Sequence, residues 1–529
     1  MTERRENGWL AVLLAAVGVV YLSLLPVCYN YDGTVFAQFL RYALLRHDVL
    51  AVTQLHHLFY FPLAYGSYRG LEALIGYHVL EYFHLQLLSL LFALGSLWLV
   101  HRMLKRLVAD PVVRLLGVIW VAGLFQFWLM GVESEVHMAA FFFATACVHR
   151  LGFAGERRLD PLLAGACAAL AAGFHLAQGL LVLVGLVWLC WKRKGWRLVL
   201  SFLLGFGLIL VPAFLLVAWR QGLPILQWLH AIVSPSASLG GTEAIPWSSP
   251  SLAALKTSLE ASAASLVTAP TPGWAELAWL VLGFLVVLAL RGSRRSGPPW
   301  LTGLLALWLT PFFVFFTLNN TGVGEFKLPV IVPLVLAALA GVAALRRGLA
   351  RAVALTGAAG LLLVNGFVGI APLTRWQNNL DWQRAQAIEA ATPPGSVVVI
   401  SGSFRGYGMG KIYIPYFSLR KAIILDWRIR DRSLEPARAE IARELAAGHP
   451  VFFHSDTAEG SPAMAEVRAK HGLSAAEVLH FLAEWSLGPL IPLPGGHALR
   501  QVRQGGLAGF RNAPTAGQRA GVASSRSMS

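Results

Sequence analysis

The chain has 529 residues, of which 56% are hydrophobic and 13% are charged, and its mean hydropathy is +0.61. This balance excludes an ordinary soluble domain and is typical of a protein whose solvent is largely lipid. The formal net charge of +16 would suggest nucleic-acid binding in a soluble protein. Here the basic residues form short clusters between apolar runs, so they indicate membrane topology and no nucleic-acid partner.

Hydrophobic runs long enough to span a bilayer recur from Trp9 almost to Pro372. Only helices satisfy their own backbone groups within one such run, so we expect an all-α polytopic membrane domain over residues 1–372 and no transmembrane β-barrel. The expected spans are 9–28, 78–100, 112–131, 136–152, 161–190, 198–219, 275–290, 301–317, 328–345 and 352–371.

Basic clusters between these runs predict the orientation. They lie at 101–106, 156–158, 191–197, 291–295 and 346–351. Because Lys and Arg favour the cytoplasmic side, all five should face the cytoplasm. The run 161–190 lies between two of them, so it must cross an even number of times, and we expect two short helices hinged near 173–179. The total is about eleven helices, with the N-terminus inside and the C-terminus outside.

The N-terminal run resembles a signal sequence, since charged residues precede an apolar stretch in residues 1–30. It has no small-x-small cleavage site, so we expect an uncleaved signal anchor. The cysteines show no metal-ligand spacing, and buried packing is expected for them instead of a disulfide framework. They are Cys28, Cys147, Cys167 and Cys190.

The chain changes character after Pro372. A charged run at 381–391 and another at 435–447 read as helices, and short apolar runs read as buried strands. These runs are 396–400, 422–425 and 450–453. We therefore expect a small C-terminal α/β domain over 373–511 on the outer face, followed by a small, polar, disordered tail at 512–529.

Nearly every conspicuous ionisable residue outside the basic clusters and the tail falls on the outer face of this topology, in the long first loop 29–77, the turn 131–137 and the turn 319–327. These residues are Asp32, His56, His57, Glu133, Glu135, His137, Glu325 and Lys327. Asp32 stands just past an apolar segment, where an acid is costly unless it has a function. This one-sided gathering predicts an active site at the outer face.

Three stretches carry a family resemblance. The acid in Tyr31-Asp32-Gly33 opens the first outer loop, an apolar His-rich stretch follows at 54–63 (QLHHLFYFPL), and a late turn reads EFKLPVIVPL at 325–334. Together they resemble the membrane glycosyltransferases of the GT-C superfamily, which include the protein O-mannosyltransferases and the aminoarabinose transferases. The resemblance covers about residues 9–372, and the helix count and outer C-terminal domain agree with it. The adjacent acids typical of the mannosyltransferases are missing, because Gly33 follows Asp32.

This resemblance implies an inverting transfer of a sugar from a polyprenyl-phosphate carrier to an acceptor at the outer face. The acceptor hydroxyl must lose a proton as it attacks C1, and the departing phosphate needs its charge stabilised. Asp32 suits the first role; Lys327, with Arg69 or Arg41 as further candidates, suits the second. The other substrate-binding candidates are His56, His57, Tyr60, Glu133, Glu135, His137 and Glu325.

Each assignment has a simpler rival. Asp32 could be a helix cap or turn residue, and the adjacent His56 and His57 could merely sit at the water interface. Glu133 and His137 could keep a turn hydrated, yet they are four apart and would share a helical face if that helix begins early. Lys327 could snorkel from the start of a helix, with Glu325 as its ion-pair partner.

Aromatic residues and a glycine-rich loop give weaker signals. The aromatic side chains fit an interfacial belt better than a sugar-stacking platform. They are Tyr60, Tyr65, Tyr68, Trp228 and Trp247. Arg405 and Lys411 lie in a glycine-rich loop after a strand, which weakly suggests phosphate binding and more simply a flexible loop.

No acid beside Asp32 supplies the aspartate cluster of metal-dependent oligosaccharyltransferases, so we expect no cofactor and no metal, although Asp32, Glu133 and His137 could converge on a divalent cation. The competing functions are a transporter or flippase of lipid-linked sugars, for which no internal repeat is visible, and a non-catalytic member of the same fold. The Ala-, Gly-, Leu- and Arg-rich composition suggests a bacterial inner-membrane protein with its C-terminal domain in the periplasm and a lipid, glycan or protein acceptor.

Overall fold

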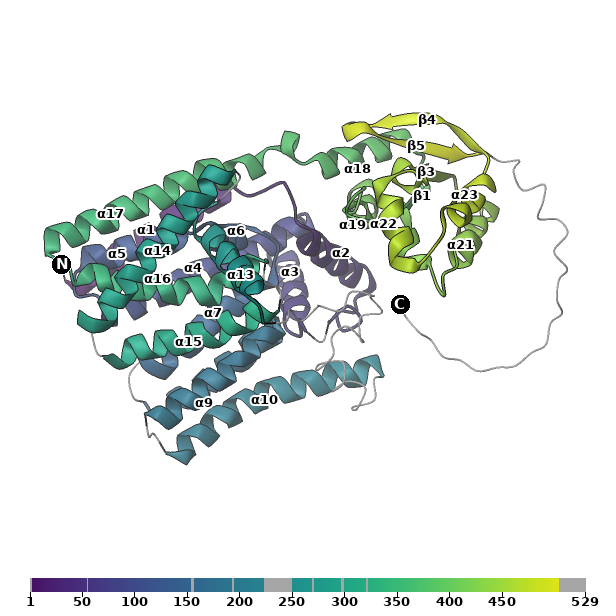
Figure 1. Cartoon of the computed structure of the whole chain (residues 1–529). Helices are drawn as coiled ribbons and strands as arrows, with labels where there is room; N and C mark the ends of the chain where they lie inside the picture. The colour runs from purple at the N-terminus through teal and green to yellow at the C-terminus, as the bar shows by residue number, and fades with distance from the viewer. Residues whose placement is uncertain are drawn as a thin grey trace. The chain divides into compact units, whose positions relative to one another are not determined.

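The computed structural model (Figure 1) describes residues 2–54, 56–153, 157–192, 195–222, 250–268, 271–295, 299–319 and 322–503. The chain divides into two compact units, residues 1–26 with 36–374, and residues 27–35 with 375–529. We call them the membrane unit and the C-terminal unit. The short segment 27–35, which the sequence placed in the membrane domain, belongs to the C-terminal unit. Trp228, Trp247 and the tail 512–529 lie outside the described residues.

The membrane unit is helical (Figure 1). Its helices are α1 (Glu3–Ser23), α2 (Tyr31–Arg46), α3 (Tyr60–Ile75), α4 (Glu81–Leu107), α5 (Pro111–Gly123), α6 (Phe125–Val132), α7 (Val136–Val148), α8 (Asp160–Phe174), α9 (Leu181–Trp191), α10 (Trp196–Gln221), α13 (Leu252–Leu266), α14 (Pro272–Arg295), α15 (Pro299–Leu318), α16 (Leu328–Ala343) and α17 (Arg347–Val364). Two 3₁₀ turns, η2 (Leu176–Leu180) and η3 (Glu325–Lys327), precede α9 and α16.

Eight helical segments of the described chain are long and apolar enough to cross a membrane, or nine if the bent pair α5 and α6 is one span. Two shorter apolar helices, Asp160–Phe174 and Leu176–Trp191, occupy the run predicted to fold back on itself, and the break between them falls at the expected hinge. Together these segments account for every span expected from the sequence. The chain is a polytopic, mainly helical membrane protein.

The bent pair shows how a broken span keeps its backbone satisfied. α5 and α6 meet at an angle of 68°. The side chain of Asn365 donates to the carbonyl oxygens of Gly123 (2.7 Å) and Leu266 (2.8 Å) and accepts from the N–H of Thr268 (2.9 Å). Because an unpaired backbone group inside the bilayer costs several kcal/mol, a buried amide at the bend makes the break tolerable.

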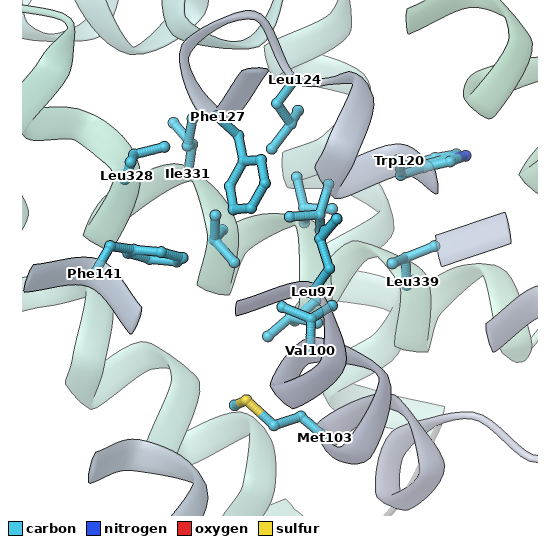
Figure 2. Packing of buried hydrophobic residues seen from close by; sticks show 14 of the residues in the cluster. Leu97, Val100, Met103, Trp120, Leu124, Phe127, Phe141, Leu328, Ile331 and Leu339 are labelled. Atoms are coloured by element: carbon cyan, nitrogen blue, oxygen red, sulfur yellow. The ribbon is translucent and has the colours of Figure 1, made fainter. Parts of the chain in front are cut away.

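The core of the membrane unit is built from helices far apart in sequence. Figure 2 shows Leu97, Val100 and Met103 of α4 packing with Trp120 of α5 and Ile331 of α16. Elsewhere glycines let backbones touch, since a Cβ at Gly341 of α16 would lie 1.9 Å from the carbonyl oxygen of Leu288 in α14. Close packing of this kind holds helices together where lipid supplies no hydrophobic drive.

The segment predicted as a long first loop contains two helices, α2 and α3. The position of this loop between two spans was predicted, and the helices inside it were not. Both helices are amphipathic and too short to count as spans, so a search for apolar runs passes over them. Arg41 of α2 pairs with Glu81 at the start of α4 (2.9 Å), which ties the segment to the helix that follows it.

The C-terminal unit is an α/β domain, as predicted. Its strands are β1 (Val397–Ile400), β2 (Lys421–Ile424), β3 (Val451–His454), β4 (Leu487–Leu493) and β5 (His497–Val502), in the sheet order β2-β1-β3-β5-β4. β1 runs parallel to β2 and β3, whereas β5 runs antiparallel to β3 and β4. Its helices are α18 (Leu380–Ala391), α19 (Gly410–Tyr413), α20 (Leu425–Arg428), α21 (Glu435–Ala446), α22 (Pro462–His471) and α23 (Ala475–Ala483).

The three predicted strands correspond to β1, β2 and β3, and the two predicted helices to α18 and α21. The hairpin β4–β5 was not predicted. None of the four cysteines, all of which lie in described parts of the chain, forms a disulfide.

Candidate functional site

The loop before α3 is fixed against the hinge between α8 and η2. The N–H of Phe59 donates to the carbonyl oxygen of Gly173 (3.2 Å), and Nδ1 of His57 lies 2.8 Å from the carbonyl oxygen of Phe174. A Cβ at residue 173 would lie 2.1 Å from the ring of Phe59, so only glycine fits there. The predicted pair His56 and His57 is thus held in place by the hinge.

Four histidine side chains form a continuous row inside the membrane unit. The rings of His56 and His57 lie 4.2 Å apart, those of His57 and His175 5.8 Å, and those of His175 and His137 4.8 Å. We call His56, His57, His137 and His175 the histidine cluster. His175 caps the end of α8 and was not among the predicted site residues. Its signal in the sequence is a histidine inside a long apolar run, at the hinge.

The turn η3 reaches the same cluster. The ring of Phe326 lies 5.1 Å from that of His137 and 5.3 Å from that of His175. The Glu325 carboxylate oxygen Oε1 lies 4.0 Å from Nε2 of His137. The structure therefore brings His56, His57, His137 and Glu325 together, as the one-sided gathering of ionisable residues predicted.

Lys327 points into the protein. Its side chain is fully buried, and Nζ donates to the hydroxyl of Ser258 in α13 (3.0 Å) and to the carbonyl oxygen of Phe316 in α15 (3.3 Å). A snorkelling lysine would extend to water, so this geometry contradicts the rival interpretation. Both of these partners are neutral oxygens, so neither cancels the positive charge of the ammonium group.

Glu133 ends α6 and is buried, and it accepts a hydrogen bond from the hydroxyl of Tyr82. Burial raises the pKa of Glu133 to about 8, so at pH 7 the group is mainly a neutral carboxylic acid. An extended stretch separates it from α7, which begins at Val136. Glu133 and His137 were expected to share a helical face only if that helix began early, and it does not. Glu135 caps α7 and is also buried.

Burial also lowers the pKa of two histidines of the first loop, that of His57 well below its ordinary value and that of His56 by less. At pH 7 both rings are therefore neutral, and each offers one donor and one acceptor nitrogen. Such groups suit hydroxyl groups better than a phosphate dianion.

Three of the remaining candidates contact other side chains of the protein. Tyr60 is buried, and its ring packs against Phe36 (5.2 Å between centroids), so it cannot stack on a sugar in this arrangement. Arg69 forms an ion pair with Glu72 of its own helix. Arg41 is likewise paired with Glu81. Each arginine is therefore paired with a carboxylate in this structure.

Asp32 lies in the C-terminal unit, in the first turn of α2, and its side chain is exposed. The cap of this helix is Asn30, whose Oδ1 accepts from the N–H of Gly33 (2.7 Å). The rival interpretation of Asp32 as a helix cap is therefore wrong. An exposed carboxylate that plays no part in capping is available for chemistry.

No protein-family model and no curated protein sequence matches the chain. Several solved structures do match the chain. ArnT from Cupriavidus metallidurans bound to undecaprenyl phosphate matches with a TM-score of 0.63 at 12% identity, over 96% of this chain and 100% of ArnT. Its apo state matches with a TM-score of 0.63 at 13% identity, over 94% and 98%. The mycobacterial arabinofuranosyltransferase AftD matches with a TM-score of 0.56 at 14% identity, over 95% of this chain and 40% of AftD.

The chain shares the fold of these two proteins. At identities this low the likeness concerns the fold, so site residues still depend on the geometry of this chain. Within that fold, the C-terminal unit carries the glycine-rich loop 401–411. The Asp456 carboxylate fastens the loop, since it accepts from the hydroxyl of Ser401 (2.7 Å) and the N–H of Tyr407 (3.2 Å). The loop is therefore anchored, contrary to the simpler expectation of a flexible loop.

The basic residues of this loop differ from each other. Arg405 is exposed and lies 3.5 Å from the Glu466 carboxylate. Lys411 is buried, with Nζ 4.7 Å from the ring centre of Phe404. Neither arrangement by itself adds to the weak phosphate-binding signal of the sequence.

Within the described ranges of the chain, no three His, Cys, Asp or Glu side chains are placed so that they could hold a metal ion. The metal-independent enzyme expected from the sequence stays a prediction, which a chelator tests.

Proposed function

We propose that this protein is an inverting glycosyltransferase that moves a sugar from a polyprenyl-phosphate carrier to an acceptor at the outer face of the membrane. The observation that carries the proposal is the gathering of His137, His175 and Glu325 beside the turn that holds the buried Lys327, inside a membrane unit with the GT-C fold. Ionisable groups are expensive in such a setting, and they mark functional sites.

Asp32 is the general base in this proposal. It takes the proton of the acceptor hydroxyl while that oxygen forms a bond to C1 of the sugar. The bond from C1 to the carrier phosphate breaks, and its electron pair leaves with the phosphate oxygen. Direct displacement at C1 inverts the anomeric configuration, and a general base of this kind contributes about 10²- to 10⁴-fold to the rate.

Lys327 stabilises the charge of the departing phosphate. A buried ammonium group bonded to the neutral oxygens of Ser258 and Phe316 is held in place before the reaction, so little reorganisation is needed as the charge develops. The ArnT structure that shares the fold was solved with undecaprenyl phosphate, which supports a polyprenyl-phosphate carrier here.

The neutral rings of the histidine cluster bind hydroxyl groups of the sugar. His57 has one nitrogen committed to the carbonyl oxygen of Phe174, which fixes the ring and leaves the other nitrogen to a substrate. Glu133 is a neutral acid at pH 7, so it can also bind a sugar hydroxyl, and it adds no negative charge that would oppose the departing phosphate.

The test is sugar transfer by the purified protein, offered a panel of polyprenyl-phosphate sugars. We expect one donor to be used and Asp32→Asn to lose at least about a hundredfold in kcat. Asp48→Asn is the matched control, since Asp48 lies in the same outer segment and pairs with Arg220 (2.6 Å). It should keep nearly full activity. No transfer from any donor by folded protein, or an active Asp32→Asn variant, would refute the proposal.

We propose further that the enzyme needs no metal ion, and activity should survive dialysis against a chelator. Loss of activity that returns with one divalent cation would contradict this. The proposed location is a bacterial inner membrane with the N-terminus in the cytoplasm and the C-terminal unit in the periplasm. Reporter enzymes fused to each end should report opposite compartments; the same compartment for both would overturn the orientation.

A further inference from the structure

The segment that carries Asp32 is fastened to the C-terminal unit through its backbone. The hydroxyl of Tyr413 donates to the carbonyl oxygen of Tyr29 at 2.7 Å. Nδ2 of Asn379 donates to the carbonyl oxygen of Val27 at 2.5 Å, while Oδ1 of the same side chain caps α18. Two carbonyls of the segment 27–35 are thus bound by side chains that follow them by about 350 residues or more.

Aromatic rings hold the same segment from the side. The ring of Tyr29 stacks on that of Phe417, with 5.5 Å between centroids and 11° between planes, and meets the edge of Trp376 at 5.9 Å. The ring of Tyr31 meets Phe404 of the glycine-rich loop at 5.7 Å. The partly buried side chain of Tyr29 packs against the hydrophobic core of the C-terminal unit, which holds the segment to that core.

These contacts end where α2 begins. Asn30 caps the helix, with Oδ1 on the N–H of Gly33 and its backbone oxygen on the hydroxyl of Thr34 (2.8 Å). Asp32 lies within this first turn, three residues after Tyr29. The direction of the Asp32 carboxylate therefore depends on two things. One is the position in which the backbone of Tyr29 is held, and the other is the residue at which Asn30 caps the helix.

We propose that Tyr413 and Phe417 of the C-terminal unit are positioning residues for Asp32. The inference rests on the proposed role of Asp32 as general base. Tyr413 fixes the backbone of Tyr29 by its hydrogen bond, and Phe417 fixes the ring of Tyr29 by stacking. A shift of about 1 Å in a reacting group can cost about a hundredfold in rate, so Tyr413 and Phe417 control the rate through Asp32 without touching the substrate themselves.

If the same contacts only stabilised the fold, removing the Tyr413 hydroxyl would lower stability as the loss of any comparable buried hydrogen bond does. It would not lower kcat more than such a loss elsewhere in the same core. The chain offers a matched pair for separating the two. Tyr407 is as buried as Tyr413, belongs to the same core cluster, and donates its hydroxyl to the carbonyl oxygen of Asp381 at the same distance of 2.7 Å. That bond ties the glycine-rich loop to α18 and does not involve the segment 27–35.

The experiment compares Tyr413→Phe with Tyr407→Phe in the full-length protein, measuring kcat, the KM for the donor and the unfolding midpoint. Each variant loses one hydroxyl, so we expect similar small drops in the midpoint. Only Tyr413→Phe should lose kcat, by about tenfold or more, with the donor KM unchanged. Equal effects on kcat from the two variants would overturn the proposal.

Two further variants guard against a simple folding defect. Phe417→Tyr keeps the stacked ring and should keep kcat, whereas Phe417→Leu should lose it. In an Asp32→Asn background, Tyr413→Phe should cause no further loss, because the two residues act through one group. An additive loss would overturn the positioning role. If Asp32→Asn itself remained active, the proposed function would fail instead, so the two failures are distinguishable.

Discussion

Replacing Glu133 by Gln tests whether this buried side chain, at the end of α6, is protonated at neutral pH. The pKa of Glu133 is raised to about 8 from an ordinary value of 4.5, because burial disfavours the carboxylate. Between these two pH values the folded protein holds the proton and the unfolded chain has released it. Stability therefore falls as the pH rises through this window and levels off above about pH 8.

The expected slope is about 1.4 kcal/mol per pH unit, which amounts to about 3 kcal/mol between pH 5.5 and pH 7.5. Gln has the same shape as the protonated acid and can accept a hydrogen bond from Tyr82 through its amide oxygen. It does not titrate, so the variant should lack this part of the pH dependence and be more stable than the wild type at pH 7.5.

The assay is the unfolding midpoint of the purified protein in detergent, followed across pH 5.5 to pH 9. The wild-type midpoint should fall with pH and that of Glu133→Gln should stay nearly level. Glu260→Gln is the control, because Glu260 is an exposed residue paired with Lys256 on one helix, and it should follow the wild type. Parallel curves for wild type and Glu133→Gln would refute the assignment of a raised pKa to this residue.

Three further substitutions test other parts of the membrane unit. Lys327→Met keeps the length of the side chain and removes its charge, so kcat should fall by about a hundredfold or more, measured by sugar transfer; a variant with normal kcat would remove Lys327 from the mechanism. Gly173→Ala should destabilise the protein by about 1–3 kcal/mol, because the new Cβ would lie 2.1 Å from the ring of Phe59. Gly179→Ala is the control, since a Cβ there meets nothing within 4 Å, and it should leave the unfolding midpoint unchanged. Asn365→Ala leaves buried backbone groups without partners and should cost about 2–4 kcal/mol in the same measurement, and a cost below about 0.5 kcal/mol would contradict its role at the bend.

The sequence predicted the spans because their signals are local. Apolar runs report lipid-facing helices directly, and the basic clusters on either side of 161–190 required a second crossing there. Strands β1, β2 and β3 were predicted for the same reason, since each is a short apolar run. The hairpin β4–β5 was missed because Pro489 and Pro492 interrupt one strand and Arg500 the other, which hides the alternating pattern.

The site was predicted less completely because its geometry depends on contacts between distant segments. His56, His57, His137 and Glu325 were singled out by charge and position alone. His175 was passed over as part of a hinge, since nothing in the local sequence shows that its ring lies 4.8 Å from that of His137. That Asp32 belongs to the C-terminal unit follows from aromatic packing across some hundreds of residues, for which no local pattern exists.

The hydrogen bond between Tyr413 and the carbonyl oxygen of Tyr29 joins residues 384 positions apart, so the ribosome makes the two partners at different times. A ribosome adding about 5–20 residues per second needs about 20–80 s to make that stretch of chain. During this time the Asp32 segment has already been made and its partners have not. On the proposed role of Asp32, the nascent chain stays inactive until its last domain has folded, and we expect a chain truncated before residue 413 to enter the membrane and yet transfer no sugar.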